Sequence, residues 1–170
     1  DRLRVVLGGP TDIAGAAAAL AAPFGPGDVV IGPMVPSLAE AGTSANAAVW
    51  ALRTAQARPA TPRPVQADDL LPERAIAGDP QAVRTLLERY FEPLASANGQ
   101  LLTTVGAYLE FGGSLEATAK VLDVHPNTVR YRLRKITDVL GLDPTHAREG
   151  FVLRIALVYG RLSEAGQLSA

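Results

Sequence analysis

Polar and basic side chains between residues 126 and 140 have the types that contact base pairs and phosphates. Four basic residues fall within 130–135, and Asn127 and Tyr131 lie among or just before them. Arginine can donate two hydrogen bonds to guanine in the major groove, and asparagine can pair with adenine. Lysine, threonine and tyrosine commonly hold phosphates, and a helix N-terminus adds partial positive charge. This stretch therefore predicts a surface that binds double-stranded DNA.

The apolar residues of the same stretch predict which face is outward. At about 100° per residue of helix, Val129, Leu133, Ile136 and Leu140 fall on one side and form a stripe for burial. Asn127, Tyr131 and Arg134 then point away from this stripe, and Arg132 lies nearest its edge. We predict these DNA-binding residues: Asn127, Thr128, Arg130, Tyr131, Arg132, Arg134 and Lys135.

The predicted contacts divide into two kinds. Arg134 and Asn127 are the expected contacts to base edges, and Tyr131 is a weaker candidate for the same role. We assign backbone positioning or flanking contacts to the others, Thr128, Arg130, Arg132 and Lys135. The alternative is a solvated basic face on a bundle helix, because Arg and Lys often cover exposed helix surfaces.

A helix-turn-helix over residues 114–140 would position these side chains. Ser114 can cap a helix over 115–122, and a short turn at 123–124 leads to a longer helix over 126–140. His125 or Asn127 can act as the N-cap, and Pro126 suits the first helical position. Gly141 ends the helix.

The rest of the second half is also helical in pattern. Asp79 and Pro80 form an N-cap followed by proline at the first turn, and apolar residues continue at helical spacing to Leu94. A further helix covers 101–111, and a closing helix covers 147–162. Residues 65–113 carry seven acidic and three basic residues, so the basic character is local to the predicted recognition helix.

The front of the chain predicts an α/β unit. A predicted strand at 4–7 ends in a turn at 8–10, and Thr11 and Asp12 are good N-cap residues for a helix at 13–22. A second strand at 28–31 and helical segments to about residue 57 follow. Prolines at 59, 62 and 64 then interrupt regular structure.

Beyond the prolines, residues 65–67 form a short predicted strand, and Asp68 or Asp69 caps a turn of helix at 72–77. The predicted fold class is α+β overall. A partial α/β region covers 1–64, and an all-α domain covers 65–170.

Composition excludes several kinds of site. The chain has 170 residues, a net charge of −1 and no cysteine, so thiolate metal sites and cysteine nucleophiles are excluded. The two histidines are too few for a His-rich metal site. No stretch approaches the roughly 18 uninterrupted apolar residues that span a bilayer. We expect no enzyme activity, no cofactor, no metal and no membrane partner.

The segment 108–136 resembles the C-terminal DNA-binding domain of PucR/CdaR-type bacterial transcriptional regulators. The recurring core of that domain is His-x-Asn-Thr-Val-x-Tyr-Arg-Leu, which is matched here by His125, Asn127, Thr128, Val129, Tyr131, Arg132 and Leu133. The resemblance covers about 70–162 and implies a cytoplasmic transcription regulator. Less closely, the front region resembles the later part of a degenerate GGDEF-like domain, although the signature Gly-Gly-(Asp/Glu)-Glu-Phe is missing.

Two other hypotheses for the function stay open. The helices could form a dimerisation or interaction module without direct DNA contact, or the front could be a degenerate nucleotide-binding, cyclase-like domain. Asp68 and Asp69 are the carboxylates that such a cyclase would use, but adjacent carboxylates more often cap a helix.

The resemblance to PucR/CdaR-type regulators favours a homodimer that binds two DNA half-sites. The chain begins at Asp1 without methionine, so we expect a fragment whose effector, if it has one, binds upstream.

Overall fold

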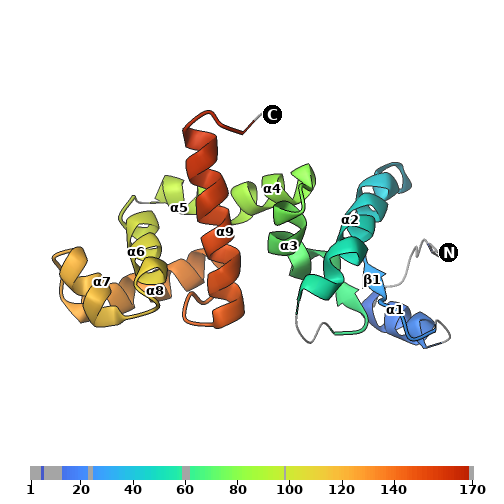
Figure 1. Ribbon diagram of the computed structural model, residues 1–170, viewed down its shortest axis with the longest axis horizontal. Coiled ribbons are helices and arrows are strands. Elements are labelled where there is room, and N and C mark those ends of the chain that lie inside the picture. The colour runs from blue at the N-terminus through green and yellow to red at the C-terminus, as the bar shows by residue number, and fades with distance from the viewer. Residues whose placement is uncertain (1–4, 6–12, 23–24, 59–61, 98, 169–170) are drawn as a thin grey trace. The chain divides into compact units, whose positions relative to one another are not determined.

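The computed structural model describes residues 5, 13–22, 25–58, 62–97 and 99–168 (Figure 1). The chain forms two compact units, Asp1–Ala82 and Val83–Ala170. Each unit has its own hydrophobic core. They are described separately below.

The first unit combines short helices with two short strands. Its elements are α1 (Ile13–Ala21), β1 (Val30–Ile31), η1 (Leu38–Glu40), α2 (Ala41–Thr54), η2 (Ala55–Ala57), β2 (Val65–Gln66), η3 (Ala67–Leu70) and α3 (Leu71–Ile76). The strands pair in parallel, with Val30 opposite Val65 and Ile31 opposite Gln66. Parallel strands need a crossover connection, and α2 lies within it. The described part of the first unit is thus mostly helical and contains one small parallel sheet of two strands.

Alanines of α2 form much of the first core. Ala47 and Ala51 of α2, with Ala55 of η2, are buried together with Val65 and Leu70. Alanine has the highest helix propensity and carries a small side chain, so α2 can pack closely on the segment that follows β2. This packing holds β2 and η3 in the first unit. The compact division therefore falls after Ala82, whereas the sequence predicted a boundary after Pro64.

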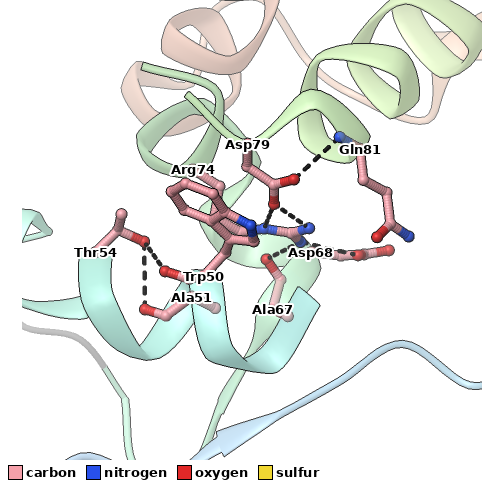
Figure 2. Close-up of polar contacts among 8 residues, drawn as sticks. All are labelled: Trp50, Ala51, Thr54, Ala67, Asp68, Arg74, Asp79 and Gln81. Atoms are coloured by element: carbon pink, nitrogen blue, oxygen red, sulfur yellow. Dashed lines mark hydrogen bonds and ion pairs between the residues drawn. The ribbon is translucent and has the colours of Figure 1, made fainter. Parts of the chain in front are cut away.

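Arg74 and Asp79 form a buried ion pair near the end of the first unit (Figure 2). Arg74 is 1% exposed, its Nε donates to Asp79 Oδ2 at 2.9 Å, and its Nη1 donates to the Ala67 carbonyl at 3.1 Å. The other Asp79 oxygen accepts a hydrogen bond from the Gln81 backbone N–H at 3.0 Å. Asp79 therefore caps α4 (Pro80–Leu86), as predicted, and also neutralises a buried guanidinium.

Asp68 and Asp69 do not occupy the N-cap position of α3, which is Leu70. Residues 67–70 form the 3-10 turn η3, and α3 begins after Leu70 without a side-chain cap. The Asp68 carboxylate lies instead 3.8 Å from Arg74 Nη1. The burial of Arg74 gives this carboxylate a charged partner, which the local sequence could not reveal.

Several predictions at the front of the chain fall on residues that the structure does not describe. The predicted turn at 8–10 and the caps Thr11 and Asp12 lie outside the described residues. The predicted strand at 4–7 also lies outside them except for Val5, which is exposed and has no regular secondary structure.

The second unit is helical in its described residues. After α4, its elements are the π-helical turn η4 (Leu87–Phe91), α5 (Glu92–Ala97), α6 (Gly99–Glu110), α7 (Leu115–Val121), α8 (Pro126–Leu140) and α9 (Ala147–Glu164). The predicted continuous pattern from Pro80 to Leu94 is therefore broken by one wider turn, in which the Glu92 N–H reaches the Leu87 carbonyl. Phe91 and Leu94 are nevertheless both buried.

A close helix contact holds α9 against η4. A Cβ atom placed on Gly160 would lie 2.0 Å from the nearest carbon of the Phe91 ring. Only glycine therefore allows this ring to rest on the backbone of α9. The same core includes Val105 of α6 and Leu153 of α9, both almost fully buried.

Candidate nucleic-acid interface

The helices α7 and α8 form the predicted helix-turn-helix, and α6 packs against both (Figure 1). Ser114 Oγ accepts a hydrogen bond from the Ala117 N–H at 3.2 Å and caps α7. The turn passes through Asp123, whose φ is 51°, and the Val124 N–H returns to the Ala119 carbonyl at 3.0 Å. The second of these bonds ties the turn back to α7, two residues before α8 begins.

Both ends of α8 have the predicted caps. The Asn127 N–H donates to His125 Nδ1 at 3.1 Å, which makes His125 the N-cap, and Pro126 occupies the first turn. At the other end, Gly141 has a φ of 68° and its N–H donates to the Thr137 carbonyl at 2.8 Å. A left-handed residue of this kind ends a helix without steric cost when it is glycine.

The apolar stripe of α8 is turned inward. Val129 and Ile136 are 0% exposed and Leu133 is 5% exposed. Leu140 is partly buried and packs on the same core, and Ala119 of α7 is buried beside it. The predicted division of α8 into an inner and an outer face is confirmed.

The outer face of α8 carries most of the predicted DNA-binding residues. Thr128 and Arg132 are partly exposed, and the exposed members are Asn127, Arg130, Tyr131, Arg134 and Lys135. Such a face can present several hydrogen-bond donors and three exposed positive charges to one ligand. Contact of these residues with DNA stays a prediction.

Two pairs of side chains organise the outer face. Arg130 Nη1 donates to Asn127 Oδ1 at 2.6 Å. Lys135 Nζ lies 5.3 Å from the centroid of the Tyr131 ring, within the range of a cation–π contact. Arg134 has no hydrogen bond or ion pair with another described residue, so its donors face solvent.

Arg132 joins α8 to α6. Its Nη1 donates to Thr104 Oγ1 at 3.2 Å and its Nη2 donates to Gln100 Oε1 at 3.0 Å. We predicted a phosphate or flanking contact for this side chain, and the structure directs two of its donors to the protein itself. Sequence reasoning missed Gln100 and Thr104, which carry no local signal because they lie 32 and 28 residues from Arg132.

The side chains whose pKa values differ from their usual values do not belong to the outer face of α8. Hydrogen bonds from the Thr145 backbone and hydroxyl lower the pKa of Asp143, in the turn before α9. Burial, with a smaller effect from Asp143, raises the pKa of Tyr108, and burial raises that of Tyr159. These groups belong to the structural support of the helices.

The described part of the chain lacks both a metal-binding cluster and a membrane-spanning helix. Within it, no group of three or more His, Cys, Asp or Glu side chains could hold a metal ion. None of the helices described there is long and apolar enough to cross a membrane.

A known protein family matches this helical region. Residues 101–159 match the model of the PucR C-terminal helix-turn-helix domain, a range that runs from α6 into α9. The match includes the whole of α7, the turn and α8.

Two related proteins match parts of the chain. An uncharacterized protein of Mycobacterium tuberculosis is 47% identical over 144 residues, which is 85% of this chain and 35% of the relative. The carbohydrate diacid regulator of Escherichia coli is 37% identical over 60 residues, which is 35% of this chain and 16% of that protein. The chain thus spans about a third of the length of the mycobacterial relative.

A solved structure covers both units. The crystal structure of a regulator of polyketide synthase expression from Bifidobacterium adolescentis has a TM-score of 0.81 and 36% sequence identity, and the match covers 94% of this chain and 63% of that one. The predicted GGDEF-like character of the front region receives no support from these comparisons. The comparisons do show that residues 101–159 are similar to the PucR C-terminal helix-turn-helix domain.

Proposed function

We propose that this chain is a sequence-specific DNA-binding transcriptional regulator that places α8 in the major groove. One observation carries the proposal: α8 buries its apolar stripe and leaves a polar, basic face in solvent. An α-helix fits the width of the major groove, and the second helix of a helix-turn-helix is the one that enters it.

The outer face supports a division of the contacts. Arg134 and Asn127 contact base edges, and Tyr131 can add a weaker contact of the same kind. Thr128, Arg130 and Lys135 hold phosphates or flank the bases. Arg132 keeps α8 on α6 and so positions the other side chains, and its three remaining N–H donors can still approach a phosphate.

The wider setting belongs to the same proposal. The protein acts in the cytoplasm as a homodimer, since one short recognition helix reads few base pairs and a dimer reads two half-sites. A small-molecule effector, if one is used, binds outside this chain. The region 1–64 is proposed as a remnant of a GGDEF-like domain without catalytic activity.

A genomic pull-down with the whole chain tests the proposal. The parent should enrich defined genomic fragments, and a variant with Arg130, Arg134 and Lys135 changed to Ala should lose that enrichment. The matched control replaces Arg53, Arg84 and Arg161, which are also exposed and lie outside α8, so that the net charge falls equally. Equal enrichment by the parent and the α8 variant would refute DNA reading by this face and favour an interaction module.

A further inference from the structure

Arg132 is held against α6 by two hydrogen bonds. Its Nη1 donates to Thr104 Oγ1 at 3.2 Å, and its Nη2 donates to Gln100 Oε1 at 3.0 Å. The Thr104 hydroxyl donates its own hydrogen to the Gln100 backbone carbonyl at 2.6 Å, so its oxygen serves arginine as an acceptor. The guanidinium is therefore tied to Gln100 twice, directly and through the hydroxyl of Thr104.

These bonds leave Arg132 able to bind a ligand. A guanidinium carries five N–H donors, and the two bonds to α6 use one donor on each Nη atom. The Nε–H and one donor on each Nη remain. The Arg132 side chain is partly exposed, whereas Thr104 is 0% exposed. Arg132 is thus anchored on a buried residue and still accessible to a ligand.

An open groove of about 320 Å³ lies beside Arg132, which we call the Arg132 groove. Its walls come from α6, the turn after α7, and α8, and the residues are Gly99, Gln100, Thr103, Leu122, Val124 and Arg132. Of these described residues, Arg132 alone carries a charge. The Thr103 hydroxyl donates to the Gly99 carbonyl at 2.8 Å, so it is already used within α6. The groove therefore suits a small anionic group that Arg132 can bind.

Arg132 lies on the side of α8 that carries other proposed phosphate contacts. Thr128 precedes it by four residues and Lys135 follows it by three, and residues at these spacings are neighbours on a helix surface. When a recognition helix lies in the major groove, the side chains along its flank can reach the sugar-phosphate backbone. A backbone phosphate is thus the anionic group of DNA that this side of α8 can meet.

We infer that Gln100 and Thr104 are positioning residues, which hold the Arg132 guanidinium in place for one phosphate of the DNA backbone. Phosphate oxygens accept hydrogen bonds from the fork of N–H donors on an arginine. An arginine that is already held in place loses less conformational freedom when it binds. The inference rests on the proposed function, and it extends that function to residues of α6, outside the recognition helix.

Binding of the full chain to a mixed-sequence duplex tests the inference, because a phosphate contact does not depend on base sequence. Gln100→Leu removes the acceptor for Nη2 at an exposed position and keeps a side chain of similar size. It should weaken binding by about three- to tenfold, the effect of one hydrogen bond. It should also lower the slope of log K against log salt toward that of Arg132→Ala, which should lose about 0.9. Fluorescence anisotropy titrations at several salt concentrations measure both quantities.

A double-mutant cycle separates positioning from a direct contact of Gln100 with DNA. In the Arg132→Ala background, Gln100→Leu should change neither affinity nor slope, since no guanidinium is left to position. The matched control is Gln56→Leu, which makes the same substitution at an exposed site in η2 and should leave both quantities unchanged.

Thr104→Val gives a second test at the other acceptor. It removes the hydroxyl at nearly constant volume and should weaken binding and lower the slope in the same way as Gln100→Leu. Circular dichroism shows whether each variant is folded. The exposed Gln100 variant decides the test if the buried Thr104 variant does not fold.

Inorganic phosphate, titrated into the free chain, tests a small anion as the alternative ligand. The backbone amide resonance of Gln100 reports on the Arg132 groove and should show no saturable shift. A saturable shift would make a free anion the ligand of the groove and overturn the assignment to DNA.

The possible results separate the inference from the function on which it rests. If Gln100→Leu lowers the free energy of unfolding but leaves affinity and salt slope unchanged, the bonds only hold α8 on α6, and the inference is overturned while DNA binding remains. An equal loss of affinity with and without Arg132 also overturns it. A folded parent that binds no duplex overturns the proposed function and the inference with it.

Discussion

Arg134 differs from its basic neighbours because its charge is not engaged by the protein. Arg130 bonds Asn127, Lys135 lies on the Tyr131 ring, and Arg134 has no such contact among the described residues. A free guanidinium loses little internal bonding when it binds. Arg134 is therefore the residue whose loss should report most directly on base reading.

Arg134→Ala should weaken binding to a selected duplex by about 1–3 kcal/mol, the range for a bidentate contact to a base. Binding to a scrambled duplex should change much less. Fluorescence anisotropy titrations on both duplexes at one salt concentration measure the difference. Arg161→Ala serves as the control, since it removes an exposed arginine from α9. Equal losses on the two duplexes would remove Arg134 from the base contacts.

Lys135→Ala should act on all sequences alike. A lysine that neutralises one phosphate releases about one counterion, so its loss should reduce the slope of log K against log salt by about 0.9. Its cation–π contact with Tyr131 is exposed and worth only about 0.5–1 kcal/mol, so folding should change little. Titrations at four salt concentrations give the slope. An unchanged slope would mean that Lys135 contacts no phosphate.

At the scale of elements, Arg132 connects two helices. Its two hydrogen bonds to α6 are partly solvent-exposed, so we expect Arg132→Ala to lower the free energy of unfolding by about 1 kcal/mol. Arg134→Ala, on the same helix without such bonds, should change it by less than about 0.5 kcal/mol. Urea unfolding followed by circular dichroism compares the two. Equal stabilities would show that the bonds to Gln100 and Thr104 do not hold α8 in solution.

The contact of α9 with η4 gives a second element-scale prediction. Gly160→Ala places a methyl group 2.0 Å from a carbon of the Phe91 ring, so the ring must move. We expect the free energy of unfolding to fall by about 1–3 kcal/mol. Gly106→Ala in α6 is the matched control, because its new Cβ would meet only the end of the Arg161 side chain at 3.1 Å. That control gains helix propensity and should be neutral or stabilising. Thermal unfolding that ranks the two variants in the opposite order would contradict the packing.

The elements that the sequence predicted well are those with local signals. Ser114, Pro126 and Gly141 mark helix ends through contacts within a few residues, and the apolar spacing of α8 specifies its inner face. The features that it missed depend on distant partners. The bonds of Arg132 and the π-helical turn beside Gly160 form only when segments far apart in sequence pack together, so neither has a local pattern.

At the scale of the whole molecule, packing between distant segments also explains why the boundary between the two units falls after Ala82 and not after Pro64. The prolines near residue 60 interrupt regular structure, but β2 finds its hydrogen-bond partner in β1, and Leu70 joins the core of α2. A break in secondary structure is therefore not a break in packing. The bond of Arg74 to Asp79, just before α4, also lies within the first unit.

Arg74→Met should destabilise the first unit far more than the second. Asp79 is only 2% exposed and would keep a buried charge without its partner, which typically costs about 3–5 kcal/mol. Hydrogen exchange of the full chain, followed by mass spectrometry of its peptides, should show lost protection in α2 and α3. The polar partners of Arg74 are Ala67, Asp68 and Asp79, which all belong to the first unit. We therefore expect protection in α6 and α8 to persist, together with binding to a selected duplex. Equal loss of protection across α2 and α8 would instead mean that the two units unfold as one.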